Sequence, residues 1–154
     1  MPAEFSDLLA GGRGLALPVQ KDLPARTLLL VDDEPSIQSA LRRILRREGY
    51  TLLFAGSAAE AFDLLSRHAV GVVISDFRMP GMDGVQFLDK VRGLYPQTVR
   101  MILSGYADVS MITGAINRGA VFRFLHKPWD DRELLEAVRD AFERFELGVV
   151  AVAA

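Results

Sequence analysis

The sequence predicts an α/β domain in which helices cover both faces of a parallel sheet. Short apolar runs of strand length occur five times along the chain, and each is followed by a segment with apolar residues at helical spacing. The runs are continuous rather than alternating, which is typical of strands buried on both faces. Strands that alternate with helices in this way pair in parallel, with the connecting helices packed on both sides of the sheet.

Composition limits the classes of function. The chain has 154 residues, which leaves room for one domain with a good core. Its formal net charge of −2 gives no broad electrostatic reason to bind nucleic acid or an anionic membrane. The lack of cysteine excludes disulfides, thiolate catalysis and cysteine-ligated zinc. Neither a signal peptide nor a membrane span is recognisable, so we expect a cytoplasmic protein without direct nucleic-acid or membrane partners.

The chain begins with residues 1–25, which are rich in glycine and proline and predict a flexible leader. The first strand covers Leu28–Val31 and ends on acidic residues. Pro35 favours the first turn of the helix that follows, because its missing N–H would be unpaired there. Gly49 is a natural end for that helix.

The same alternation repeats through the rest of the chain. Ser57 and Asp130 each precede a glutamate by three positions, a spacing that indicates a helix start. The further predicted strands are Thr51–Ala55, Val72–Ser75, Val99–Leu103 and Val121–Leu125. One helix is predicted after Ser57 and another after Asp130, and two more are predicted over Val85–Val91 and Val109–Arg118.

The third strand ends abruptly on a carboxylate, Asp76. Pro80, Gly81 and Gly84 follow within a few residues, and this density of turn-forming residues fits a loop. In open α/β sheets, ligands bind in the crevice outside the carboxyl ends of the strands. Asp76 is therefore the first candidate for chemistry.

Polar residues also follow the other strands: Asp32 and Asp33 after the first, Ser104 after the fourth and Lys127 after the fifth. Three carboxylates in one crevice would repel each other unless a cation lay among them, and hard oxygen ligands suit Mg²⁺. A lysine and a hydroxyl that face the same point suit the oxygens of a phosphoryl group. The sequence therefore predicts phosphoryl transfer to a carboxylate.

The segments LLLVDDEP, VVISDFRMPGMDG, ILSGYAD and VFRFLHKPW together resemble the receiver domain of two-component response regulators, the CheY-like superfamily. The resemblance covers roughly residues 25–147. It implies a flavodoxin-like doubly wound fold with a five-stranded sheet in the order 2-1-3-4-5. It also implies a signalling phosphoacceptor that catalyses only its own phosphorylation and dephosphorylation.

This resemblance assigns roles to single residues. Asp76 would accept a phosphoryl group from a sensor histidine kinase or a phosphotransfer protein. Mg²⁺ would be bound directly by Asp33, mainly through water by Asp32, and also by Asp76 and the backbone carbonyl of Arg78. Lys127 would contact the phosphoryl oxygens, and its bond to Pro128 would be cis.

Two switch positions and two positions near the hydrolytic water follow from the same resemblance. Ser104 would contact the phosphoryl group and shift toward it on activation, and Phe124 would be the aromatic switch. Arg78 and Tyr106 would flank the path of the hydrolytic water. Because both are large, we expect a long-lived phosphoryl group.

The receiver domain would span residues 26–147, and residues 148–154 would form a short tail or the start of a missing output domain. Receiver domains commonly dimerise or control output through the fourth helix, fifth strand and fifth helix, here the elements predicted from Val109 onward. On the last helix, Phe142, Phe145 and Leu147 supply more apolar surface than one buried stripe needs. This surface either packs against the leader or tail, or forms a homodimer face or a join to an output domain.

On the predicted helix after Pro35, a basic stripe is either solvated surface or a contact for the kinase; it consists of Arg42, Arg43, Arg46 and Arg47.

Two alternatives remain for the function. One is a degenerate receiver that acts as a constitutive interaction module, which the intact acidic pair, Ser104 and Lys127 disfavour. The other is an aspartyl-phosphate phosphohydrolase. Those enzymes typically carry a second aspartate two residues after the first, where this chain has Arg78.

Overall fold

The computed structural model describes residues 25–153, without the side chains of Tyr106 and of residues 151–153. Its five parallel strands form one sheet in the order β2-β1-β3-β4-β5, as the sequence predicts. The strands are β1 (Thr27–Val31), β2 (Thr51–Ala55), β3 (Val72–Asp76), β4 (Val99–Ser104) and β5 (Arg123–His126). The fold is therefore the expected flavodoxin-like α/β fold. Residues 1–24 of the predicted leader lie outside the described part of the chain.

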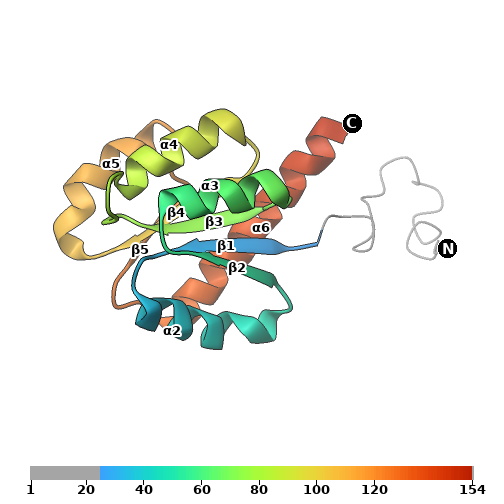
Figure 1. Ribbon diagram of the computed structural model, residues 1–154. Coiled ribbons are helices and arrows are strands. Elements are labelled where there is room, and N and C mark those ends of the chain that lie inside the picture. The colour runs from blue at the N-terminus through green and yellow to red at the C-terminus, as the bar shows by residue number, and fades with distance from the viewer. Residues whose placement is uncertain (1–24, 154) are drawn as a thin grey trace, which may run out of the picture.

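Helices cover both faces of the sheet (Figure 1). The helices are α2 (Pro35–Leu45), α3 (Ala58–Arg67), α4 (Gly84–Leu94), α5 (Val109–Asn117) and α6 (Asp131–Ala153), with short 3₁₀ turns η3 (Arg46–Glu48) and η4 (Tyr106–Asp108). One apolar core lies between the sheet and α3, α4 and α5, and a second lies between the sheet and α2 and α6. Successive residues of β1 alternate between them, because side chains on a strand point to opposite faces: Leu29 and Val31 enter the first core, and Leu28 and Leu30 the second.

The predicted helix signals are confirmed. Ser57 Oγ accepts a hydrogen bond from the backbone N–H of Glu60 at 3.2 Å, and Asp130 Oδ1 accepts one from Glu133 N at 3.0 Å. Pro35 opens α2, and the turn after η3 ends at Gly49, whose φ of 83° is in the left-handed region that favours glycine.

The fifth strand begins later than predicted, at Arg123 rather than Val121. The backbone N–H groups of Ala120 and Val121 both donate to the carbonyl of Ala115, at 2.9 and 3.2 Å. These two residues therefore close the C-terminal end of α5, so the sheet ladder starts only after them. An apolar run in the sequence is compatible with both the closing turn of a helix and the start of a strand, so it cannot distinguish between them.

Most of the excess apolar surface expected on the last helix is buried within the domain. Phe142 is fully buried and stacks on Tyr50 with ring centroids 4.8 Å apart, while Phe145 packs beside Gly71. Only Leu147 of the three is exposed, at 64%. Residues 148–153, expected as a tail or the start of another domain, continue α6 as helix.

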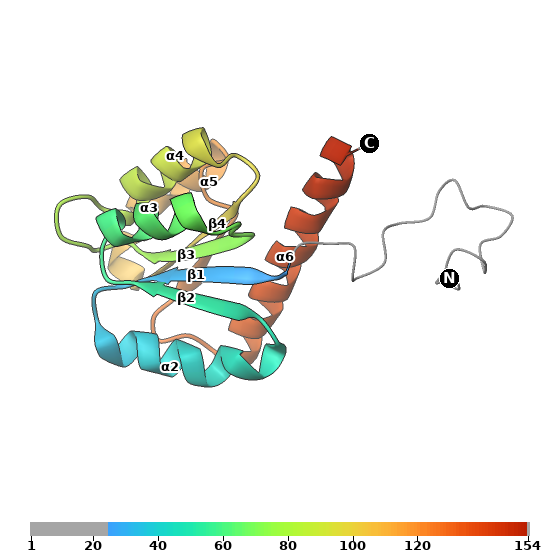
Figure 2. The ribbon, with the colours of Figure 1, turned by 45° about the vertical axis from the view of Figure 1, so that its right-hand side comes forward.

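The beginning of β1 and the last part of α6 lie at the same end of the sheet. Arg26 and Glu146 form a two-pronged ion pair, with Nε and Nη2 each 2.8 Å from a carboxylate oxygen. In both views, α6 extends past the sheet at this end (Figures 1 and 2). The carboxyl ends of the strands face the opposite way.

Candidate functional site

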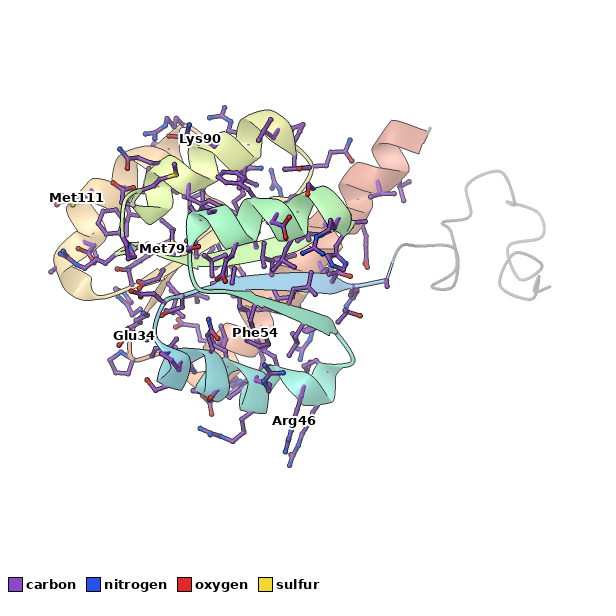
Figure 3. The ribbon with its side chains drawn as sticks, in the orientation of Figure 1. Glu34, Arg46, Phe54, Met79, Lys90 and Met111 are labelled. Atoms are coloured by element: carbon purple, nitrogen blue, oxygen red, sulfur yellow. The ribbon has the colours of Figure 1, made fainter. Side chains whose placement is uncertain are left out.

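The parallel register of the sheet brings the predicted site residues together. Val31 pairs with Ser75, Asp76 with Leu103, and Ser104 with His126, so these strands end side by side. The site residues are the last residue of a strand or the first residues after one: Asp32, Asp33, Asp76, Ser104 and Lys127. Side chains that rim the same edge, Glu34, Met79 and Met111, are labelled in Figure 3.

Three carboxylates form a cluster at this edge. One oxygen each from Asp32, Asp33 and Asp76 lies within 4.8 Å of the others. Asp32 and Asp76 are buried, at 2% and 7% exposure, whereas Asp33 is exposed. Burial raises the pKa of Asp76, the positive charge of Lys127 opposes that rise, and the negative charge of Asp32 adds to it. Two buried carboxylates with a third, exposed one beside them suit a hard divalent cation.

Lys127 is the internal counter-ion of the cluster. Its Nζ lies 2.9 Å from Asp32 Oδ2, 3.3 Å from Asp76 Oδ1 and 3.7 Å from Glu34 Oε1. Burial alone would lower the pKa of Lys127, but the hydrogen bond and charge of Asp32, together with Asp76, raise it above its ordinary value. The ammonium is therefore positively charged throughout the physiological range. Its bond to Pro128 is cis, as expected.

Backbone contacts hold Lys127 and Asp32 in place. The N–H of Lys127 donates to the carbonyl of Ser104 at 2.8 Å, which continues the pairing of β4 and β5 to the edge. Asp32 Oδ1 accepts from the N–H of Glu34 at 2.8 Å, and the side chain of Gln38 donates to the carbonyl of Asp32 at 2.7 Å. One oxygen of Asp32 is thus fixed by the start of α2, and the other is directed at Lys127.

The loop after Asp76 folds back closely on β3. The N–H of Gly84 donates to the carbonyl of Phe77 at 2.7 Å. A Cβ at Gly84 would lie 2.3 Å from the carbonyl oxygen of Asp76, so no other residue fits there without displacing the loop. Asp83 and Gln86 then form a capping box that starts α4. A groove of about 450 Å³ between this loop and α5 is lined by Asp33, Phe77, Arg78, Met79, Pro80, Asp83 and Met111.

Ser104 and Arg78 share a partner that sequence reasoning missed. Ser104 Oγ donates to Asp108 Oδ2 at 2.5 Å, and Arg78 Nη2 donates to Asp108 Oδ1 at 2.6 Å. Ser104 and Asp108 are both 2% exposed. Asp108 ends the ILSGYAD segment, and an acidic residue four positions after Ser104 was the available sequence signal.

The remaining predicted residues have distinct positions. Phe124 in β5 is half-buried against the core under α5, and its ring meets that of His126 edge-on with centroids 4.6 Å apart. The guanidinium of Arg78 is engaged by Asp108, while its backbone N–H lies 3.4 Å from Asp76 Oδ1. The side chain of Tyr106 lies outside the described part of the structure.

The basic stripe lies on the surface of the protein. Arg42 lies over the ring of Phe54, with its guanidinium carbon 4.2 Å from the ring centroid. Arg43, Arg46 and Arg47 are exposed, and Figure 3 labels Arg46 on the outer side of the α2 layer. Arg42 is exposed as well, so all four arginines reach the surface, although the position of Arg42 is fixed by Phe54.

The fold and these side chains together define a doubly wound α/β protein with an acidic site at the carboxyl edge of its sheet. The family model described as the response regulator receiver domain matches residues 28–139. The chain therefore belongs to the family of response regulator receiver domains of two-component systems, which are signalling proteins rather than metabolic enzymes.

Two relatives are hydrogenase transcriptional regulatory proteins. The chain is 44% identical over 117 residues to the hydrogenase transcriptional regulatory protein HoxA of Cupriavidus necator, and 41% identical over 121 residues to HoxA of Bradyrhizobium diazoefficiens. These matches cover 76% and 79% of this chain but 24% and 25% of the relatives. The chain thus spans about a quarter of the length of these proteins.

Solved structures include a signal receiver domain of an HD domain-containing protein from Pseudomonas fluorescens, with a TM-score of 0.79 and 39% identity, covering 87% of this chain and 96% of that one. The beryllofluoride-activated NtrC4 receiver domain dimer matches with a TM-score of 0.72 and 34% identity, covering 77% of this chain and 98% of that one. Within residues 25–153, no helix combines the length and apolar character needed to cross a bilayer.

Proposed function

We propose that Asp76 accepts a phosphoryl group from a phosphohistidine on a sensor histidine kinase or a phosphotransfer protein. A carboxylate oxygen of Asp76 bonds to phosphorus as the bond from phosphorus to the histidine nitrogen breaks. That nitrogen keeps the electron pair and takes up a proton. The observation that carries this proposal is the contact of Asp76 with Lys127, at 3.3 Å, inside a cluster of three carboxylates.

The residues of the site have different roles in this transfer. Asp33, Asp32, Asp76 and the backbone carbonyl of Arg78 would hold Mg²⁺, which when bound offsets the negative charge of the carboxylates and the phosphoryl oxygens. Lys127 neutralises a further phosphoryl oxygen from its position between Asp32 and Asp76. Among the described residues, Lys127 is the one basic side chain that forms an ion pair with Asp76, so it is the main internal source of positive charge.

After transfer, Ser104 moves to the phosphoryl group and Phe124 changes its packing under α5. The resulting surface change would affect the face formed by α5, β5 and α6, through which the protein would dimerise or control an output domain or effector. The NtrC4 receiver matched above is described as a beryllofluoride-activated dimer, which supports dimerisation as the output.

Arg78 and Tyr106 set the lifetime of the phosphoryl group in this proposal. They follow the phosphoacceptor and Ser104 by two positions each, and their size limits access of water. Loss of the phosphoryl group should be faster in Arg78→Asn and Tyr106→Ala variants than in the wild type. Equal rates would remove both residues from this role.

Mass spectrometry after incubation with acetyl phosphate and Mg²⁺ tests the phosphoacceptor role. We expect one phosphoryl adduct on the wild type and on an Asp63→Asn variant, whose substituted carboxylate is exposed on α3, and no adduct on Asp76→Asn. Size-exclusion chromatography of the same samples tests dimerisation. No adduct on folded wild type that binds Mg²⁺, even with candidate kinases, would favour a constitutive interaction module.

A further inference from the structure

Asp108 is a buried carboxylate to which the roles described so far assign no function. It links two residues that come from different strands: Ser104, the last residue of β4, and Arg78, two residues after the end of β3. Each of its oxygens accepts one hydrogen bond from them, at 2.5 and 2.6 Å. A buried carboxylate with a short hydrogen bond to a hydroxyl and an ion pair to a guanidinium is a strong local attachment.

The hydrogen bond to Asp108 excludes a second use of the Ser104 hydroxyl. A serine side chain has a single proton to donate. While this proton points at Asp108 Oδ2, it cannot also point at a phosphoryl oxygen on Asp76. Contact of Ser104 with the phosphoryl group, as the proposed function requires, therefore has to break the bond to Asp108.

The position of Asp108 connects this exchange to α5. Asp108 is the last residue of η4 and lies directly before α5. Its backbone is in the right-handed helical region, with φ −98° and ψ 0°, rather than in the extended region of a capping residue, and its side chain makes no capping hydrogen bond. The carboxylate therefore attaches the start of α5 to Ser104 and Arg78 and does not cap the helix.

We propose that Asp108 is a positioning residue that holds Ser104 away from Asp76 before phosphorylation, and that loss of this bond on phosphorylation loosens the start of α5 from β4. Phosphorylation at Asp76 attracts the proton of Ser104 and the bond to Asp108 breaks, which leaves Arg78 as the remaining partner of that carboxylate. This inference rests on the proposed phosphoacceptor role and adds the route by which the event at β3 reaches α5. The strength of the Asp108 bond then sets how readily the protein adopts its activated state.

Beryllofluoride, a mimic of the phosphoryl group, tests this route as a binding equilibrium. Trp129 is the only tryptophan of the chain and lies two residues after Lys127, so its fluorescence can report binding in the presence of Mg²⁺. Asp108→Ala removes the competing acceptor, and we expect it to bind beryllofluoride about tenfold more tightly than the wild type. Asp108→Asn keeps a neutral acceptor and should show a smaller gain.

The gain has to depend on Ser104. In a Ser104→Ala background, Asp108→Ala should no longer tighten binding, because the exchanged hydroxyl is missing. Asp89→Asn is the matched control, since Asp89 on α4 also pairs with an arginine, Arg118, at 2.6 Å, but lies outside the site. The affinity of the Asp89→Asn variant for beryllofluoride should equal that of the wild type.

Binding that is unchanged or weakened in folded Asp108→Ala would overturn the inference while leaving the phosphoacceptor role intact. Absence of beryllofluoride binding by the wild type would overturn both. NMR of the wild type adds a test that needs no variant: beryllofluoride should shift the Asp108 carboxyl carbon and the amides of Ser110 and Met111. No shift of the Asp108 carboxyl carbon on saturation would equally refute the exchange.

Discussion

Removal of the Lys127 charge provides a quantitative test of how the acidic site is balanced. Lys127→Met keeps the length and most of the volume of the side chain but leaves Asp32 and Asp76 facing each other without their shared counter-ion. Loss of one partner of a buried ion pair costs about 3 to 5 kcal/mol. Because the Lys127 side chain is 18% exposed, we take the lower value of about 3 kcal/mol.

For a domain of this size, 1 kcal/mol corresponds to a change of about 2 to 4 °C in Tm. We therefore expect the variant to melt roughly 6 to 12 °C below the wild type when divalent cations are chelated. Mg²⁺ should restore most of this difference, because it binds the same carboxylates and Lys127 no longer competes with it. The increase in Tm on adding Mg²⁺ should thus be larger in the variant than in the wild type.

Differential scanning fluorimetry with and without Mg²⁺ measures both quantities. Lys90→Met is the matched control: Lys90 is exposed on α4, and its replacement should alter neither Tm nor the response to Mg²⁺ (Figure 3). If Lys127→Met melts with the wild type in the absence of metal, or gains no more than the wild type from Mg²⁺, Lys127 is not the counter-ion of the cluster.

Three further predictions concern the loop, the phosphoacceptor and the basic stripe. Gly84→Ala should lower the free energy of unfolding by about 2 kcal/mol through overlap with the Asp76 carbonyl, whereas Gly93→Ala, which meets no atom within 4 Å, should not destabilise; urea unfolding compares them. At neutral pH without metal, Asp76→Asn should melt above the wild type. Since burial raises the pKa of Asp76, the folded protein binds this proton more tightly than the unfolded chain, so the Tm difference should shrink as the pH falls toward the ordinary value of about 4. Arg43→Glu with Arg46→Glu should slow phosphotransfer from the cognate kinase about tenfold but leave phosphorylation by acetyl phosphate unchanged.

Each of these predictions has an outcome that contradicts it. Equal stability of the two glycine variants would mean that the loop adjusts without cost. A Tm difference independent of pH would show that the charge of Asp76 is not what destabilises the site. Slower reaction of the double arginine variant with acetyl phosphate as well would indicate damage to the domain rather than loss of a kinase contact.

The strand ends were predictable from sequence because a buried parallel strand is a local signal. A continuous apolar run has few alternatives, and the carboxyl ends of parallel strands share one edge, so the meeting of Asp32, Asp76 and Lys127 followed from their positions alone. The same reasoning placed the start of β5 too early. Val121 has the side chain of a strand residue, but its N–H closes α5, and that choice depends on where α5 ends.

The partners of Asp108 and the burial of the α6 aromatics were not predictable in the same way. Asp108 lies in a 3₁₀ turn, and its contact with Arg78 joins residues 30 positions apart. Phe142 packs on Tyr50, which is even more remote in sequence, so an excess of apolar residues on the helix could be counted but its packing partners could not be predicted. Such contacts depend on the relative positions of several elements, which no periodicity in one element encodes.

The ion pair between Arg26 and Glu146 also has a practical consequence. It lies at the end of the sheet away from the acidic site, and a five-residue strand such as β3 separates the two ends by about 17 Å. A reporter fused beside either residue, or a linker that tethers the protein to a sensor surface there, would leave the phosphoacceptor edge facing the solution. Immobilised in this orientation, the domain could be presented to different kinases in turn and read by surface-sensitive optics, with its acidic site accessible.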